Sequence, residues 1–238
     1  GAEKLRSEVR DGFETKFKMP VYEGYGTTET SPGASVNLPD IESPHKLRNR
    51  PGSVGKAFSG TEFRIVNPDS LEPLPTGEDG LILIGGPQIM KGYLKMPEKT
   101  AEVIELIDGY RWYRSGDKGH LDEDGFLTIV DRYSRFAKIG GEMISLTTVE
   151  EEILDACNEK DLEIAATCLP DQRKGEKIVL LATSNLDKNK LTKQLSDAQV
   201  NPLYHPAQVL IVEEIPKLGS GKTDFGATKK IALVNEQK

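Results

Sequence analysis

The sequence predicts a mixed fold, α/β and α+β, that is built in two parts. The first part opens with a helical pattern over residues 1–20 and continues with mostly β-like segments over residues 53–130. The second part alternates helical and strand patterns, which predicts a small α+β unit. Charged residues and glycines dominate the short region between them, so we place a hinge-like domain boundary near residue 131.

Composition and charge exclude several classes of protein. The chain has 238 residues, 37% of them hydrophobic, which is too apolar for a disordered chain and enough for a buried core. Every apolar run is shorter than the roughly 18 residues that a transmembrane helix needs. A formal net charge of −7 argues against a general nucleic-acid binder. Two cysteines, Cys157 and Cys168, do not make a disulfide scaffold and suit a reducing compartment.

In the first part, apolar residues recur every four positions before residue 20 and predict a helix. These residues are Leu5, Val9, Phe13 and Phe17. Residues 31–52 are rich in Pro and Asn and are predicted to form a loop. Strands are predicted at 61–66, 80–84 and 126–130, and a short helix is predicted to begin at Pro97.

The second part begins with a predicted helix N-terminus. Thr147 and Glu150 have the spacing of a capping box, with Thr147 as the N-cap. The elements that follow are predicted as strands at 164–169 and 178–183, a helix near 188–198 and a strand near 209–212.

Residues 219–223 read Gly-Ser-Gly-Lys-Thr and resemble the end of a phosphate-binding loop. The Walker sequence requires a glycine five residues before Gly221, where this chain has Pro216. Only 16 residues follow Lys222, which is too few for a nucleotide-binding α/β core. We therefore reject the Walker interpretation. Taken alone, the segment is a flexible turn that carries a solvated lysine.

Residues 24–29 begin like a dinucleotide-binding fingerprint but place Glu29 where a third glycine belongs. Glycines and hydroxyls after a strand still allow close approach to a nucleotide, and a carboxylate can hold Mg²⁺ beside phosphates. A tight turn without any ligand explains the segment equally well.

Residues 112–117 place Asp117 after a glycine, where its carboxylate could accept two ribose hydroxyls or cap the turn locally. The three histidines, His45, His120 and His205, lack metal-ligand spacing with the cysteines. The chain also has no Gly-x-Ser-x-Gly elbow. A zinc site and a hydrolase triad are therefore both disfavoured.

In their order along the chain, these segments are similar to the adenylate-forming superfamily of acyl-CoA synthetases, luciferases and peptide-synthetase adenylation domains. The matching residues are 25–29, 92–93, 113–117, 131–132 with 138–142, and 221–222. The resemblance covers essentially the whole chain. It implies a reaction in which a carboxylate attacks the α-phosphate of ATP, releasing pyrophosphate, and a thiol then takes the acyl group from the acyl-adenylate.

Residues 131–146 and 218–225 most resemble the acyl-acyl carrier protein synthetase part of a bifunctional 2-acylglycerophosphoethanolamine acyltransferase. In that subfamily the acid would be a fatty acid, and the thiol would be the phosphopantetheine arm of acyl carrier protein. An acyl-CoA synthetase, with CoA as acceptor, is the main alternative. A non-catalytic binding module of the same fold is a further alternative, but it has no need of Lys222, Asp117 and Glu29 together.

For the nucleotide, the resemblance implies that Tyr25 stacks on adenine and that Thr28 touches phosphate. Gly26 and Thr27 belong to the same binding segment. Glu29 would hold Mg²⁺ and take part in catalysis.

The remaining ligand contacts come from later segments. Asp117 would bind the ribose hydroxyls with help from Arg132, a charged donor. Lys222 would be catalytic, donating to the carboxylate and to oxygens near the α-phosphate, where two anions must meet. A preorganised donor of this kind typically lowers the barrier by about 3–4 kcal/mol.

The family also rotates its small domain between the two half-reactions. Counting two residues past Arg132 places the hinge at Ser134, where the family usually has Asp or Lys. After rotation Lys138, also catalytic, would face the active site, and Gly141 would leave space for pantetheine. Four basic residues would form a patch for an acidic carrier protein or an ordinary solvated surface. They are Arg135, Arg173, Lys174 and Lys177.

The phosphate-gripping segment of this family, a Ser/Thr/Gly-rich run ending in Pro-Lys, is absent and would lie upstream of residue 1. We therefore expect the C-terminal part of a large domain at 1–130, divided into a nucleotide-binding end at 1–45 and a β-rich subdomain at 46–130. Residues 131–238 would form a small lid domain. We expect no ligase activity from this chain alone, a location on the cytoplasmic side, and inner-membrane contact only through upstream domains.

Overall fold

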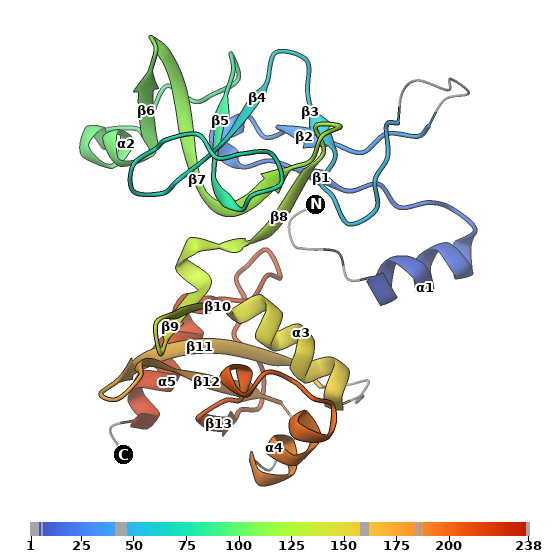
Figure 1. The fold of residues 1–238 in the computed structure, drawn as a ribbon, viewed down its shortest axis with the longest axis vertical. Coiled ribbons are helices and arrows are strands. Elements are labelled where there is room, and N and C mark those ends of the chain that lie inside the picture. Colours follow the sequence, from blue (N-terminus) through green and yellow to red (C-terminus); the bar gives the residue numbers. More distant parts are fainter. Residues whose placement is uncertain are drawn as a thin grey trace. The chain divides into compact units, whose positions relative to one another are not determined.

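The computed structural model describes residues 5, 7–40, 47–157, 162–183, 186 and 188–236. The chain divides into two compact units, Gly1–Tyr133 and Ser134–Lys238 (Figure 1). The second unit begins three residues after the predicted boundary at 131, and its first residue is Ser134, the predicted hinge. Within the described ranges, no helix has the length and apolar character needed to cross a bilayer.

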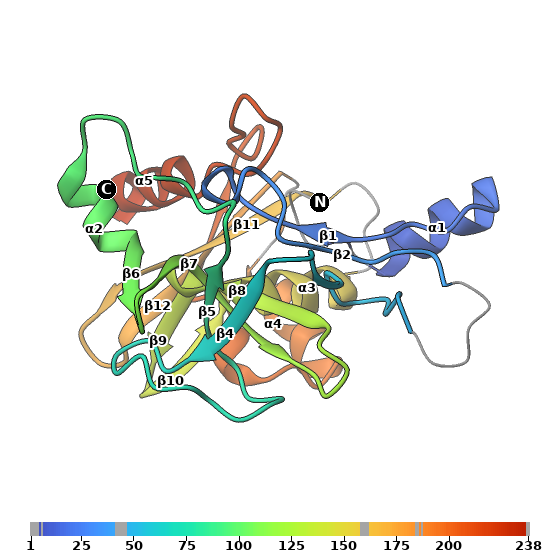
Figure 2. The ribbon, with the colours of Figure 1, turned by 90° about the horizontal axis from the view of Figure 1, so that it is seen from above.

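The first unit begins with helix α1 (Ser7–Phe17), inside the region predicted to be helical. Leu5 of the predicted apolar ladder lies before the helix, and the other three residues, Val9, Phe13 and Phe17, are 59%, 42% and 53% exposed. The rings of Phe13 and Phe17 contact each other, with centroids 4.7 Å apart. Both views show α1 at the end of an extended segment, away from the strands of its own unit (Figures 1 and 2).

A small antiparallel sheet follows, with the strand order β1 (Gly24–Tyr25), β2 (Ser35–Val36) and β3 (Lys56–Ala57). The prediction of a loop throughout residues 31–52 is therefore wrong at β2, a strand too short to show a hydrophobic period. β1 and β2 come from the predicted nucleotide-binding end and β3 from the predicted β-rich subdomain. The three strands nevertheless form one sheet, so this sheet contains strands from both sides of the predicted boundary between residues 45 and 46.

The larger sheet of the first unit is antiparallel throughout. Its order is β4 (Glu62–Val66), β5 (Gly80–Gly85), β7 (Tyr110–Leu121) and β6 (Ile104–Ile107), with β8 (Leu127–Arg132) also on β7. Helix α2 (Pro97–Val103) begins at Pro97, as predicted. Side chains alternate between the faces of a strand, so Ile82 and Ile84 enter one apolar cluster and Leu81 and Leu83 enter another.

The second unit has a sheet in the order β10 (Glu142–Ser145), β9 (Phe136–Ile139), β12 (Gly175–Ala182) and β11 (Ile164–Asp171). β13 (Gln208–Ile211) lies parallel to β12. The helices of this unit are α3 (Leu146–Cys157), α4 (Lys188–Asp197) and α5 (Phe225–Glu236). Short 3₁₀ turns occur at Pro202–Tyr204 in this unit, at Thr28–Thr30 in the first unit, and at Tyr133–Arg135 across the boundary in the sequence. The α+β class predicted for this part is confirmed.

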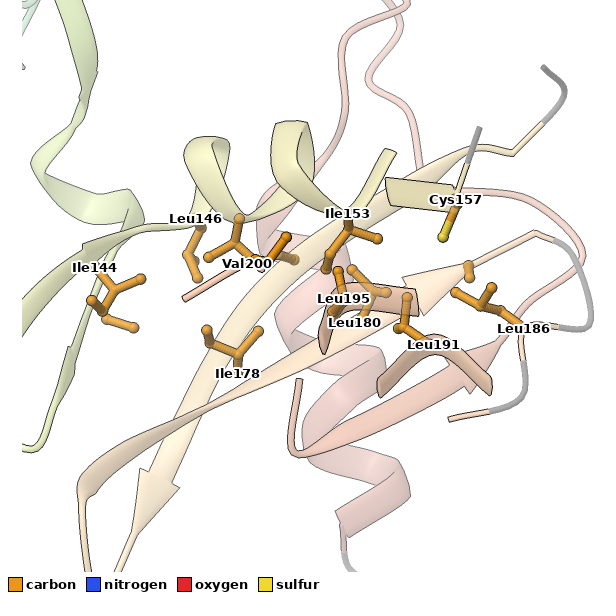
Figure 3. Packing of buried hydrophobic residues seen from close by; sticks show 14 of the residues in the cluster. Ile144, Leu146, Ile153, Cys157, Ile178, Leu180, Leu186, Leu191, Leu195 and Val200 are labelled. Atoms are coloured by element: carbon orange, nitrogen blue, oxygen red, sulfur yellow. The ribbon is translucent and has the colours of Figure 1, made fainter. Parts of the chain in front are cut away.

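Two apolar clusters cover the two faces of that sheet. On one face α3 and α4 contribute Ile153, Leu191 and Leu195, which contact Ile178 and Leu180 of β12 (Figure 3). On the other face α5 contributes Ala232 to a second cluster. That cluster also holds the alternate strand residues Val179 and Leu181. The strand period of two therefore builds a three-layered unit.

The predicted capping box at the start of α3 is wrong. The helix begins at Leu146, so Thr147 lies inside it, and the hydroxyl of Ser145 accepts the backbone N–H of Thr148 at 3.2 Å. Oε1 of Glu150 accepts hydrogen bonds from Nη2 of Arg135 and from the backbone N–H of Ala166. The buried Arg135 therefore forms a hydrogen bond with Glu150, the side chain that the local pattern assigned to the helix N-terminus.

Candidate active site

In the first unit, three of the predicted site residues meet at one carboxylate. Asp117 on β7 is only 3% exposed and lies opposite Arg132 on β8. Arg132 Nε donates to Oδ1 of Asp117 at 3.1 Å, and the hydroxyl of Tyr25 donates to Oδ2. The interpretation of Asp117 as a local turn cap is therefore wrong, because its carboxylate contacts residues from two other strands.

Burial dominates the electrostatics of this cluster. It raises the pKa of Asp117 above its ordinary value, although the hydrogen bond from Tyr25 and the charge of Arg132 act in the opposite direction. Burial and the neighbouring Asp117 charge raise the pKa of Tyr25 well above its usual range. The Tyr25 hydroxyl therefore stays protonated and serves as a donor to the carboxylate.

The turn after β1 explains why a glycine occupies position 26. A Cβ atom on Gly26 would lie 1.9 Å from the carbonyl oxygen of Pro32, so no other residue fits there. The backbone N–H of Thr27 donates to Oγ1 of the buried Thr30 at 2.9 Å, which fixes the following 3₁₀ turn. Thr28 is exposed on that turn, where it is accessible to a ligand.

Glu29 is tied to a loop far along the chain. The hydroxyl of Tyr93 donates to Oε1 of Glu29 at 2.6 Å, and the carbonyl of Glu29 accepts the N–H of Met90 at 2.9 Å. Burial acts to raise the pKa of Glu29, but hydrogen bonds, chiefly the one from Tyr93, outweigh it and lower the pKa. The carboxylate is therefore ionised at neutral pH, with Oε1 held in place.

Tyr93 is a site residue to which the sequence assigned no role. Its signal was the Gly92-Tyr93 pair among the family-like segments. A Cβ on Gly92 would lie 2.7 Å from Cγ2 of Thr100, while Oγ1 of Thr100 accepts the N–H of Tyr93 at 2.9 Å. This packing aims the Tyr93 side chain toward Glu29.

Tyr113 connects the two clusters electrostatically. Burial raises its pKa to about 12, and the negative charges of Glu29 and Asp117 both contribute. The positive charge of Arg132 in turn helps to lower the pKa of Glu29. The first unit therefore holds one polar site that includes both carboxylates, because the charges of both act on the hydroxyl of Tyr113.

In the second unit, Lys138 and Gly141 lie on one hairpin. β9 and β10 pair with Ile139 opposite Glu142, so Gly140 and Gly141 form the two-residue turn. Their φ angles are +61° and +93°, as a turn of this type requires at both positions. The side chain of Lys138 is exposed on β9, and its backbone N–H donates to Glu176 at 2.6 Å.

Lys222 lies on a second turn of the same unit. Lys217 and Thr223 form an antiparallel bridge, and the carbonyl of Lys222 accepts the N–H of Leu218 at 2.7 Å. Gly221 has a φ of +85° and closes the turn onto Leu218 at 2.8 Å. The lysine is therefore carried by an ordered hairpin rather than by the flexible segment that its Gly-Ser composition indicates.

The predicted basic patch is only partly present. Arg135 is not on the surface: it is 9% exposed and forms an ion pair with Glu150 at 2.8 Å. Arg173 and Lys174 are exposed, and Lys177 forms an ion pair with Glu236. The prediction that Arg135 contacts an acidic partner is therefore wrong, because its charge is neutralised inside the unit.

Metal-binding side chains do not gather in the part of the chain that is described. No group of three His, Cys, Asp or Glu residues could hold an ion there. The ring of His120 contacts Asp79, with Nδ1 and Oδ1 2.8 Å apart, and His45 lies outside the described residues.

Comparison with known proteins gives a consistent result. Residues 1–94 match the family model of AMP-binding enzymes. A 4-coumarate–CoA ligase-like protein of Oryza sativa subsp. japonica is 34% identical over 228 residues, which cover 93% of this chain and 39% of that protein. The long-chain-fatty-acid–CoA ligase of Bacillus subtilis (strain 168) is 32% identical over 225 residues, covering 93% and 38%.

Solved structures agree with these relatives. The crystal structure of ATP-bound MatB from Rhodopseudomonas palustris has a TM-score of 0.78 to this chain at 27% identity, covering 94% of this chain and 43% of that one. The chain thus spans about two fifths of the length of the curated relatives that it matches.

Proposed function

We propose that the chain is part of an ATP-dependent acid–thiol ligase of the AMP-binding, adenylate-forming superfamily, whose family model matches residues 1–94. The complete protein would form an acyl-adenylate and then a thioester. The observation that carries the proposal is the buried Asp117 held by Tyr25 and Arg132 in one site with Glu29. A non-catalytic module gives no reason to maintain two carboxylates in one polar site.

The first unit would bind the nucleotide. Asp117 would accept the ribose hydroxyls, with Arg132 beside it as a charged donor. Tyr25 would present its ring to adenine while its hydroxyl stays on Asp117. The exposed Thr28 would contact phosphate from a turn that Gly26 allows to close tightly.

Glu29 fits a magnesium ion that is bound with the substrate. Mg²⁺ is usually held by one or two carboxylates together with waters and substrate phosphates, rather than by a cage of protein ligands. Glu29 is an ionised single carboxylate with Oε1 already on Tyr93, so it offers one further oxygen. The ion would reduce the repulsion between ATP and the incoming carboxylate.

The second unit would supply two lysines, each on its own turn. Lys222 would donate to the substrate carboxylate and to oxygens near the α-phosphate during adenylation. Lys138 and the hairpin at Gly141 would serve the thiol-transfer step, after a rotation about Ser134.

For the substrates, we propose a fatty acid and the phosphopantetheine thiol of acyl carrier protein, as part of a phospholipid-reacylating bifunctional acyltransferase. The support is the resemblance of residues 131–146 and 218–225. CoA is the second candidate acceptor, and the names of the relatives favour it. A cytoplasmic location, and inner-membrane contact through other domains, belong to the same proposal.

Measurements of the separate half-reactions on the complete protein test the proposed roles. Lys222→Ala should abolish acid-dependent ATP–pyrophosphate exchange but leave thioester formation from supplied acyl-adenylate. Equal loss of both half-reactions would contradict the role of Lys222. Parallel assays with CoA and holo acyl carrier protein decide the acceptor, and the chain alone should show no turnover.

A further inference from the structure

Arg135 is a buried cation that follows the proposed hinge residue Ser134 directly. Its Nη2 donates to Oε1 of Glu150 at 2.8 Å, and the two side chains are only 10% and 13% exposed. The same Glu150 oxygen accepts the backbone N–H of Ala166 on β11 at 2.7 Å. The start of β9 is thereby fixed to α3 and to the central sheet of its unit.

One face of the Arg135 guanidinium lies on the ring of Phe225. The guanidinium carbon is 3.8 Å from the centre of the Phe225 ring, a distance typical of a cation–π contact. Arg makes this contact better than Lys because its charged group is planar. Phe225 is the first residue of α5, so the contact joins the segment beside Ser134 to the beginning of the last helix.

The beginning of α5 is also the base of the turn that carries Lys222. The carboxylate of Asp224 accepts the N–H of Ala227 at 2.9 Å and so caps α5. The N–H of Asp224 donates to the carbonyl of Pro216 at 2.8 Å, which closes the turn below the Lys217–Thr223 bridge. A side chain that holds Phe225 therefore holds the turn that presents Lys222.

We propose that Arg135 is a positioning residue for Lys222 and acts through the ring of Phe225. The inference rests on the proposed role of Lys222 in adenylation. Arg135 does not touch the substrate in this scheme. It keeps the Lys222 turn at a fixed place on the second unit and couples that turn to the segment at Ser134, so that the lysine moves with the body that rotates.

A second ion pair on the same turn provides a matched control. Lys217 Nζ lies 2.9 Å from a carboxylate oxygen of Glu163, but the two side chains are 48% and 53% exposed. Exposed pairs of this kind contribute little to stability. Lys217→Ala therefore removes a charged contact from the turn without touching the buried contact between Arg135 and Phe225.

Hydrogen exchange on this chain tests the coupling directly. Arg135→Lys keeps the charge opposite Glu150 but loses the planar group, and Phe225→Leu keeps an apolar side chain but loses the ring. Both should speed amide exchange at residues 217–224 by about 2- to 30-fold, the factor that corresponds to a lost cation–π contact. Exchange in β11 and β12 should not change, and Lys217→Ala should resemble the wild type.

Half-reactions on the complete protein test the consequence. Both variants should lower kcat for ATP–pyrophosphate exchange roughly ten- to a hundredfold, as expected for a misplaced catalytic group, with KM for ATP nearly unchanged. Thioester formation from supplied acyl-adenylate should be retained.

Two results would overturn the proposal: unchanged exchange at 217–224, or faster exchange throughout β11 and β12 together with equal loss of both half-reactions. The second result would make Arg135 a core ion pair and nothing more. If the wild-type protein shows no acid-dependent ATP–pyrophosphate exchange, the proposed function fails instead. The exchange comparison between Arg135→Lys and Lys217→Ala still decides whether Phe225 couples to the turn.

Discussion

The hydroxyl of Tyr93 donates a 2.6 Å hydrogen bond to Oε1 of Glu29, a residue 64 positions earlier in the chain. The bond joins the turn after β1 to the loop before α2. It affects both groups, because it raises the pKa of Tyr93 to about 12 and lowers the pKa of Glu29. A carboxylate proposed to hold a cation thus has one oxygen in use and a fixed orientation.

Tyr93→Phe should make the first unit less stable at neutral pH, by about 1 kcal/mol, the usual net value of one hydrogen bond. The folded pKa of Glu29 lies below its ordinary value of 4.5, so the contribution of this carboxylate is present above that value and is lost as pH falls through the folded pKa. The difference between the variant and the wild type should therefore shrink in acid. Urea unfolding followed by Trp112, the only tryptophan, reports on this unit.

Tyr110→Phe is the matched control for that comparison. Tyr110 is the first residue of β7 and is 71% exposed, so loss of its hydroxyl should leave the unfolding free energy unchanged at every pH. A Tyr93→Phe variant whose deficit is as large at pH 3 as at pH 7 would show that the hydroxyl does not act on the ionised carboxylate.

Gly26→Ala should destabilise the first unit by about 3 kcal/mol or more, the upper range for a side chain forced into a packed site. The added methyl group would lie 1.9 Å from the carbonyl oxygen of Pro32, a backbone atom that cannot move without opening the turn. Gly12→Ala in α1 is the opposite case, because nothing lies within 4 Å of its added Cβ and alanine favours helix. Denaturation of both variants checks the contrast, and similar midpoints would contradict it.

Local pattern predicted the elements well where one period dominated. The strands predicted at 164–169, 178–183 and 209–212 and the helix predicted near 188–198 were placed within a few residues, because apolar alternation and helical spacing decide them within a short window. β9, β10 and α5 of the same unit were not predicted. The predicted cap at Thr147 failed for a different reason. Glu150, the other half of that pattern, is taken by a cation from another element, and a short window cannot show such competition.

The candidate site was predicted mostly as residue types, and the pairing of Asp117 with Arg132 is the one side-chain contact that the family resemblance implied. Asp117 and Glu29 were identified from family-like segments, but a second partner of Asp117, Tyr25, lies 92 positions away and was not predicted to contact it. The burial of Arg135 was not predicted either, because an arginine grouped with other basic residues is expected to be exposed on the surface. Burial and long-range partners depend on how the strands pair, and that information is not contained in any one segment.

The two cysteines should be unreactive in the folded chain. Cys157 and Cys168 are both 7% exposed, and burial followed by the charge of Glu176 raises the pKa of Cys168 to about 11. The thiolate is the reactive form, so alkylation at pH 8 should be slow for the native chain and fast in urea. Labelling followed by mass spectrometry would measure both rates, and rapid native labelling of Cys168 would contradict the buried position.

Gly141 allows two explanations to be separated by substitution. The hairpin needs a positive φ at this position, and a Cβ would meet no described atom within 4 Å. Alanine at such a φ costs about 1–2 kcal/mol, whereas asparagine adopts this conformation more readily. We therefore expect hydrogen-exchange protection of β9 and β10 to fall in Gly141→Ala and to be largely kept in Gly141→Asn.

The thiol-transfer step then tests whether the same glycine also provides space for pantetheine. If it does, thioester formation from supplied acyl-adenylate should fall in Gly141→Asn despite its intact hairpin, because the added side chain occupies the path of the arm. Gly140→Asn at the neighbouring turn position, where φ is +61°, should keep both the hairpin and the step. Full activity of Gly141→Asn on the complete protein would leave the turn conformation as the sole reason for glycine at this position.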